Sequence, residues 1–137
     1  MPTAFTLLDD GQAHQLDAVI AGNLVTLTPA SVQARLGWKL TDDGLCQGAV
    51  CIPTRGYGNR LGHDGLELTA LAAALDRPLA VDVAAGGAAL GTSVGERAAR
   101  LRGLTAPDLR LNDLDGQPRR LDEFRPRKVF LLAFASW

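Results

Sequence analysis

The sequence has no apolar run long enough to cross a membrane. Its longest run, from Val129 to Ala135, is far shorter than the roughly 20 residues that a membrane-spanning helix needs. The first residues of the chain also lack the basic start and the apolar core of a secretory signal. We therefore expect a cytoplasmic protein without a membrane partner.

An excess of charge of one sign is also lacking. The formal net charge is −1, which argues against a main role in coating nucleic acid, and no nucleic-acid partner is expected. Hydrophobic residues make up 47% of the chain and charged residues 21%, values typical of globular proteins. A length of 137 residues allows one ordinary domain, or a small domain with a fragment of another.

Ligands for metals are scarce. The chain contains two cysteines, Cys46 and Cys51, and two histidines, His14 and His63. A structural zinc needs four such ligands, so one site would use all of them, and their spacing is not that of a zinc finger. We expect no metal site and no cofactor.

Residues 1–91 predict a small α+β domain of short strands and helices, of unknown role. The alternation at 24–27 indicates a half-buried strand. Thr28 as N-cap, Pro29 in the first turn and Gly37 after the last turn then bound a short helix.

A weak internal repeat relates residues 27–40 to residues 66–79. Leucine and valine recur at a constant offset, and both copies predict the end of a strand, a short helix and another strand. Apolar residues at helical spacing produce such matches by chance, so duplication and coincidence explain the repeat equally well.

Residues 84–91 are mostly alanine and glycine, a composition typical of a flexible linker. Ser93 is placed to cap a helix and Glu96 to complete a capping box. Residues 92–103 are thus predicted to form a linker helix that Gly103 ends.

The cysteine pair has two interpretations. Cys46 and Cys51 are separated by four residues that include Gly48, a spacing that allows a small disulfide across a hairpin or wide turn. They could then form a redox-active or resolving pair. Alternatively, they stay reduced and pack as small apolar side chains, as expected in a reducing cytosol.

The last part of the chain predicts a hairpin, a helical turn and a buried strand. Asp113 to Gly116 forms the turn signal of the hairpin, and Leu121 to Phe124 suits one helical turn. Val129 to Ala135 is apolar on both faces, which is typical of a parallel strand covered on both sides.

This order of segments, ending in Ala135-Ser136-Trp137, resembles the opening of the redoxin family. That family comprises the peroxiredoxins (AhpC/TSA) and the thiol–disulfide proteins similar to TlpA and ResA, and Trp137 favours the second group. The resemblance covers residues 104–137. It implies the incomplete start, a hairpin and the first core strand, of an α/β thioredoxin-like fold, with the reactive cysteine expected directly after Trp137.

The resemblance further implies a thiol-dependent oxidoreductase. Its substrate would be a protein disulfide or a peroxide, its electron donor a thiol reductant, and residues 1–137 alone would be inactive. The position of Trp137 leaves three explanations open: a domain cut, a partial gene, or a UGA codon that encodes selenocysteine. The competing function is a non-catalytic binding or regulatory module that uses residues 1–91.

Overall fold

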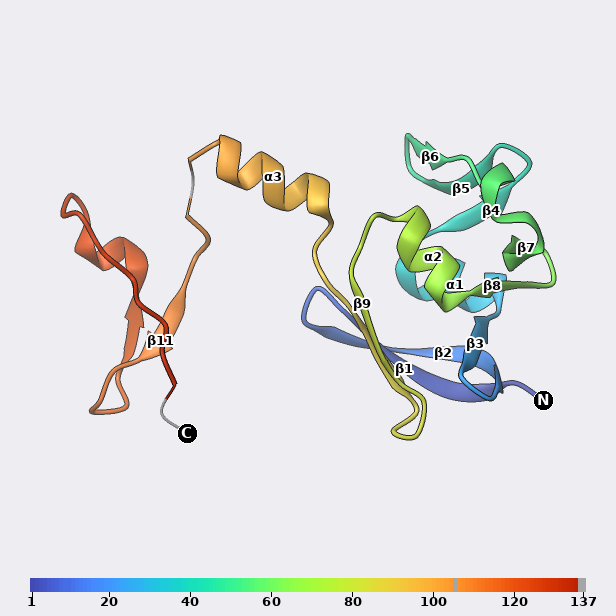
Figure 1. Cartoon of the computed structure of the whole chain (residues 1–137), viewed down its shortest axis with the longest axis horizontal. Coiled ribbons are helices and arrows are strands. Elements are labelled where there is room, and N and C mark those ends of the chain that lie inside the picture. Colours follow the sequence, from blue (N-terminus) through green and yellow to red (C-terminus); the bar gives the residue numbers. More distant parts are fainter. Residues whose placement is uncertain (105, 136–137) are drawn as a thin grey trace. The chain divides into compact units, whose positions relative to one another are not determined.

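The structure, a computed structural model, describes residues 1–104 and 106–135. The chain divides into two compact units, Met1–Arg97 and Ala98–Trp137, and each is described by itself (Figure 1). The first unit is a mixed α+β fold, as the sequence predicts. None of the helices in the described ranges is long and apolar enough to cross a membrane.

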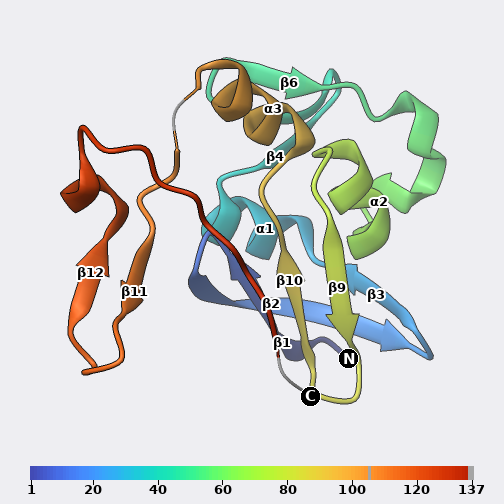
Figure 2. The same ribbon diagram turned by 60° about the vertical axis from the view of Figure 1, so that its left-hand side comes forward.

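The first unit is built on a seven-stranded mixed sheet with the order β7-β8-β3-β2-β1-β10-β9. The strands β1 and β10 run parallel, and the other neighbouring pairs are antiparallel (Figure 2). The strand bounds are β1 (Thr3–Asp9), β2 (Gln12–Ala21), β3 (Leu24–Leu27), β7 (Leu61–Gly62), β8 (Gly65–Glu67), β9 (Leu79–Asp82) and β10 (Gly87–Leu90).

A second, three-stranded sheet in the same unit has the order β4-β5-β6. Its strands are β4 (Lys39–Thr41), β5 (Gly44–Gln47) and β6 (Val50–Ile52). The remaining elements of the unit are the helices α1 (Pro29–Leu36) and α2 (Leu68–Ala74), the 3-10 segment η1 (Arg55–Arg60) and the start of α3 (Val94–Arg102).

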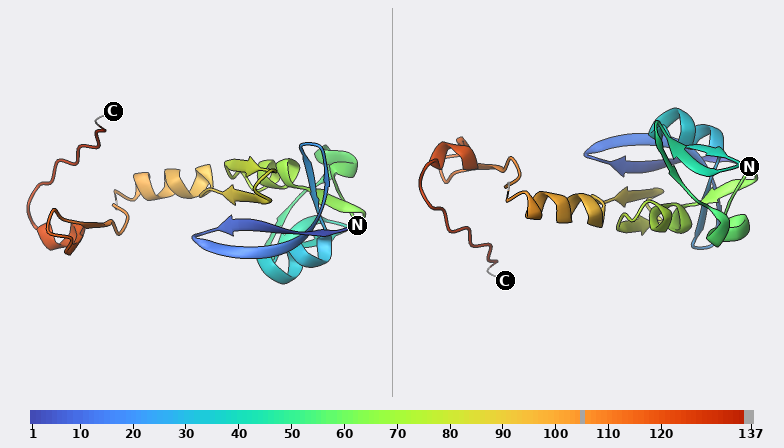
Figure 3. Two further views of the ribbon diagram at one scale, coloured as in Figure 1. Left: turned by 90° about the horizontal axis from the view of Figure 1, so that it is seen from below. Right: turned by 90° about the horizontal axis from the view of Figure 1, so that it is seen from above.

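The core lies between one face of the large sheet and the two helices. Helix α1 lies against β2, and α2 lies against β3 and β8 (Figure 3). Phe5 and Leu7 of β1 are fully buried, as are Val32 of α1 and Leu71 of α2. Every buried side chain in the described part of the chain is apolar, so hydrophobic burial is the main source of stability.

The capping residues of α1 act as the sequence predicts. The backbone N–H of Ser31 donates to the Thr28 side chain at 3.3 Å, and Pro29 occupies the first helical turn. Gly37 ends the helix at φ 75°, in the left-handed region that a side chain disfavours. Ser93 likewise accepts the backbone N–H of Glu96 at 3.1 Å and begins α3.

Both copies of the weak repeat form a strand, a helix and a strand. The first copy is β3-α1-β4 and the second is β8-α2-β9. Their equivalent residues Leu27 and Leu66 face each other across the antiparallel β3–β8 pair. Only the first strands of the two copies pair, since β4 belongs to the three-stranded sheet and β9 lies at the edge of the large sheet.

The predicted linker at 84–91 is wrong. Residues Gly87–Leu90 form β10, which lies between β1 and β9 inside the large sheet. Ala88 and Leu90 are buried there, while Gly86 makes the preceding turn at φ 66°. Glycine and alanine are depleted in strands, so local composition does not reveal this strand, which depends on its distant partner β1.

The second unit contains the predicted hairpin and helical turn. The strands β11 (Arg110–Asn112) and β12 (Pro118–Arg120) are antiparallel, and the 3-10 segment η2 (Leu121–Phe124) follows. Gly116 holds the turn at φ 75°. The thioredoxin-like start stays a prediction.

The predicted strand over Val129–Ala135 is wrong in this structure. These residues have no regular secondary structure and are exposed, Phe130 to 89% and Leu132 to 69%. A buried parallel strand needs hydrogen-bonded neighbours on both sides, and no strand in the described residues pairs with this segment. Ser136 and Trp137 lie outside the described residues.

A surface ion pair joins the end of η1 to the end of β8. The guanidinium of Arg60 donates to both carboxylate oxygens of Glu67, at 2.6 and 2.8 Å, and the Thr69 hydroxyl donates to the same carboxylate. The hydrogen bonds from Arg60 and then from Thr69 lower the pKa of Glu67 to about 2.

We expect this ion pair to make the stability depend on pH. A lowered folded-state pKa stabilises the protein above the ordinary value of 4.5, and that contribution is lost as the pH falls toward 2. Because the Arg60 side chain is 54% exposed, water screens the pair, and Glu67→Gln should lower the unfolding free energy by only about 1 kcal/mol at pH 6.

The measurement is urea unfolding of the chain and of Glu67→Gln at pH 6, 4 and 2.5. The difference between them should shrink as the pH falls. Asp43→Asn, in the β4–β5 turn, is the matched control. A difference that is equal at pH 6 and pH 2.5 would contradict the assignment.

Candidate functional site

The two cysteines face each other across the hairpin β5–β6. Cys46 and Cys51 are register partners, their Cα atoms are 4.1 Å apart, and a disulfide joins them with an Sγ–Sγ distance of 2.09 Å. Directly opposite residues in an antiparallel pair bring their side chains together on one face of the ribbon. In Figure 1 this hairpin lies at the opposite end of the unit from the β1–β2 ribbon.

Local chemistry explains why this hairpin forms. A two-residue loop, Gly48-Ala49, joins β5 to β6, and Gly48 takes φ 57° as such a loop requires. Gly44 begins β5 at φ 132°, where a Cβ would lie 2.1 Å from the carbonyl oxygen of Ile52. Only glycine fits at this position.

The hairpin is attached firmly to the core on the face away from the disulfide. Leu45 is fully buried. The side-chain amide of Gln47 donates to the carbonyl oxygen of Leu36, at the end of α1, at 2.9 Å. The cysteine pair therefore stands on a rigid support rather than on a mobile loop.

The two sulfur-bearing residues differ in exposure and in neighbours. Cys51 is exposed, whereas Cys46 is half-buried. The hydroxyl of Thr41 lies 3.4 Å from Cys46 Sγ. Lys39 is the register partner of Cys46 across β4–β5, so Lys39, Thr41 and the two cysteines share one face of the small sheet.

Two polar side chains therefore lie on the face of Cys46. The Thr41 hydroxyl donates to the carbonyl oxygen of Gly44 at 3.1 Å, and its oxygen is also within hydrogen-bond distance of Cys46 Sγ. The sequence contained a signal for them, because the turn Asp42-Asp43 and strand alternation place positions 39 and 41 on the face of position 46. Neither Lys39 nor Thr41 is among the site residues predicted from the sequence.

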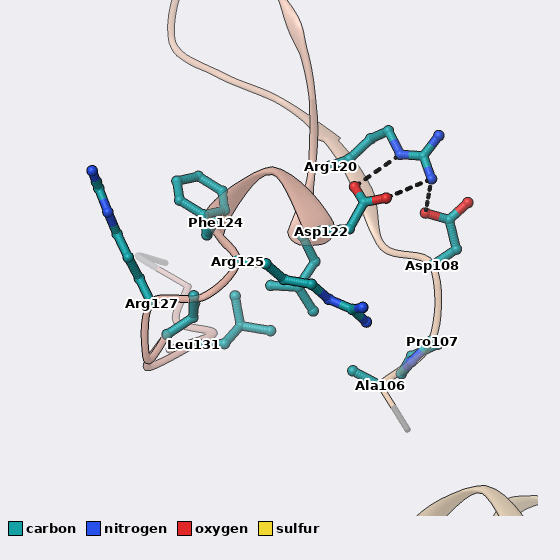
Figure 4. Close-up of a pocket in the computed structure, with 11 residues that line it drawn as sticks. Ala106, Pro107, Asp108, Arg120, Asp122, Phe124, Arg125, Arg127 and Leu131 are labelled. Carbon is teal, nitrogen blue, oxygen red and sulfur yellow. Dashed lines mark hydrogen bonds and ion pairs between the residues drawn. The ribbon is translucent and has the colours of Figure 1, made fainter. Parts of the chain in front are cut away.

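The second unit holds a cleft of about 500 Å³ (Figure 4). It lies between η2, the chain before β11 and the chain after η2, and its lining is Ala106, Pro107, Asp108, Arg120, Leu121, Asp122, Phe124, Arg125, Arg127, Val129 and Leu131. Arg120 donates to both carboxylate oxygens of Asp122, at 3.0 and 2.9 Å, and lies 3.5 Å from Asp108. These carboxylates, the hydrogen-bonded Asp122 first, raise the pKa of Arg120.

The chemistry of this cleft is limited. Its two carboxylates, Asp108 and Asp122, are both paired with Arg120, and its remaining lining is apolar apart from Arg125 and Arg127. Figure 4 shows Arg125 extending across the cleft and Arg127 pointing away from it. The cleft offers apolar surface and positive charge but no nucleophile.

The histidines do not join the cysteines in one site. His14 lies on β2 opposite Leu7, and His63 lies in the turn between β7 and β8. In the ranges 1–104 and 106–135, no group of three or more metal-binding side chains comes together.

The Cys46–Cys51 hairpin is thus the one place in the described residues where a reactive covalent bond is presented to solvent on a rigid support. Comparison of the chain with protein-family models, with curated proteins and with solved structures found no match.

Proposed function

We propose that the chain takes part in thiol–disulfide exchange, with Cys46 and Cys51 as its reducible pair. The observation that carries this proposal is the disulfide, with its exposed Cys51, at facing positions of a hairpin that Leu45 anchors in the core from the other face. A disulfide that solvent reaches is open to attack by a thiolate, whereas a buried one is not.

The exchange runs in two steps. The thiolate of a small dithiol reductant attacks Sγ of Cys51, the S–S bond breaks, and its electron pair goes to Sγ of Cys46. The Thr41 hydroxyl, which donates to the carbonyl oxygen of Gly44 in the oxidised chain, then turns its proton to the Cys46 thiolate. In the second step, the other thiol of the reductant attacks the sulfur bound to Cys51 and leaves as a cyclic disulfide. Two electrons and two protons reach the cysteine pair.

The resemblance of residues 104–137 to redoxins supports the same chemistry. In that family an oxidised nucleophile is commonly resolved by a second thiol, a role that Cys46 and Cys51 would fill. The substrate class is then a protein disulfide or a peroxide, with a thiol as electron donor. In a cytoplasmic location, which stays a prediction, a disulfide is more often redox-active than structural.

The experiment identifies the sulfur that is attacked. The oxidised chain is treated with glutathione, quenched with acid, alkylated and digested, and the peptides are measured by mass spectrometry. We expect the mixed disulfide at Cys51 and the alkyl group at Cys46, since Cys51 is the exposed partner and Cys46 the stabilised leaving group. A mixed disulfide at Cys46, or no reaction of the folded chain, would contradict the proposal.

Thr41 provides a matched pair of control variants. Thr41→Ser keeps the hydroxyl and should leave the reduction rate unchanged. Thr41→Val removes it and should slow reduction roughly two- to fivefold, because a leaving thiolate of higher pKa departs more slowly. Equal rates in the two variants would remove Thr41 from the mechanism.

A further inference from the structure

A second cavity of the first unit lies on the reverse side of the cysteine hairpin. Its volume is about 490 Å³, enough for a few side chains of a partner but not for a domain. The residues that line it come from the β1–β2 turn, α1, the small sheet, the end of α2 and the start of α3: Asp9, Asp10, Leu36, Trp38, Gln47, Val50, Ile52, Leu75, Arg77, Ser93 and Glu96.

One part of the wall of this cavity is apolar. Trp38 and Ile52 are half-buried and pack against the core, and Val50, at the edge of the hairpin, is 59% exposed. An exposed valine beside a half-buried tryptophan provides surface that an apolar side chain of a partner would cover.

The rim of the cavity is negative. Its one cation, Arg77, donates to Asp9 at 2.5 Å and to the carbonyl oxygen of Gly91 at 2.7 Å, so its charge and donors are engaged within the fold. The Asp10 carboxylate is 3.6 Å from Arg77 but 79% exposed. Glu96 is exposed and forms no ion pair among the described side chains. The lining of the cavity therefore carries three carboxylates and one guanidinium, and Asp9 already neutralises that guanidinium.

We infer that this cavity binds a segment of a partner protein that carries lysine or arginine beside an apolar side chain. The lysine or arginine of the partner would lie at Asp10 and Glu96, and its apolar side chain would lie between Trp38 and Val50. Charge complementarity selects against an acidic segment, since the only positive group is occupied by Asp9. This inference does not rest on the redox proposal, because the disulfide is on the other face of the hairpin.

The test uses the full chain and two labelled peptides, Gly-Arg-Leu-Lys-Phe-Gly amide and its counterpart with glutamate in place of arginine and lysine. Binding is followed by fluorescence anisotropy. We expect saturable binding of the basic peptide that weakens with added salt, and none of the acidic one. Equal binding of the two peptides, or none of the basic peptide up to millimolar concentration, would overturn the inference.

The variant Asp10→Asn with Glu96→Gln should weaken binding about fivefold, since exposed charges each contribute modestly. Asparagine suits the left-handed backbone of position 10, at φ 47°, so this variant should fold. Asp43→Asn with Asp64→Asn removes the same charge outside the cavity and should leave binding unchanged. If the two double variants bind equally, the cavity is not the site.

Discussion

Gly44→Ala should destabilise the first unit by about 3 kcal/mol or more, from the sum of a backbone conformation reserved for glycine and an overpacked contact. The new Cβ would lie 2.1 Å from the backbone oxygen of Ile52, and neither backbone can move without breaking the β5–β6 pairing. Because that pairing holds Cys46 opposite Cys51, the variant should also form the disulfide incompletely. Urea unfolding and a count of free thiols in the oxidised protein measure both effects.

Gly48→Ala is the matched control. Gly48 lies in the same hairpin at φ 57°, but no atom lies within 4 Å of its added Cβ. This variant should lose only about 1 kcal/mol, the penalty for a left-handed alanine. Similar losses in the two variants would show that the contact with Ile52 is not the reason for glycine at position 44.

Phe5→Ala should lower the unfolding free energy by about 3–5 kcal/mol, the usual range for removing a buried phenylalanine. Phe5 is fully buried on β1 of the large sheet and belongs to the hydrophobic core, so its removal leaves a cavity among apolar side chains. Since small proteins are stable by only about 5–15 kcal/mol, this loss is a large part of the total. Urea unfolding followed by circular dichroism measures it.

Leu8, on the opposite face of the same strand, is the control for Phe5. It is 48% exposed, so Leu8→Ala should cost about 1 kcal/mol or less. A loss as large as that of Phe5→Ala would mean that the outer face of β1 is also covered, contrary to the described structure.

Elements with local signals were predicted well from the sequence. Thr28, Pro29 and Gly37 carry the bounds of α1 in their own capping chemistry, and the alternation at 24–27 marks β3. Strands that depend on partners distant in the sequence were predicted poorly. Gly87–Leu90 resembles a linker in composition and becomes a strand only because β1 lies beside it. The opposite holds for Val129–Ala135, whose apolar composition indicates a strand although no strand of the described residues pairs with it.

The candidate site was predictable only in part. The spacing of Cys46 and Cys51 allows a hairpin disulfide, but it cannot decide between paired and reduced cysteines, because that depends on the register of β5 and β6. The cavity on the reverse face of the hairpin could not be predicted from the sequence. Its lining comes from distant parts of the chain, which meet only once the two sheets and α3 have formed: Asp10, Trp38, Val50 and Glu96.

The most direct test of the redox proposal is a titration of the chain with oxidised and reduced dithiothreitol, followed by a thiol count and by amide NMR spectra. We predict that two thiols per chain appear together in one transition. The signals of β4, β5 and β6 should shift, while those of β1 and β2 keep their folded positions. A pair that stays oxidised at every ratio, or one whose reduction unfolds the large sheet, would contradict a reversible dithiol at Cys46 and Cys51.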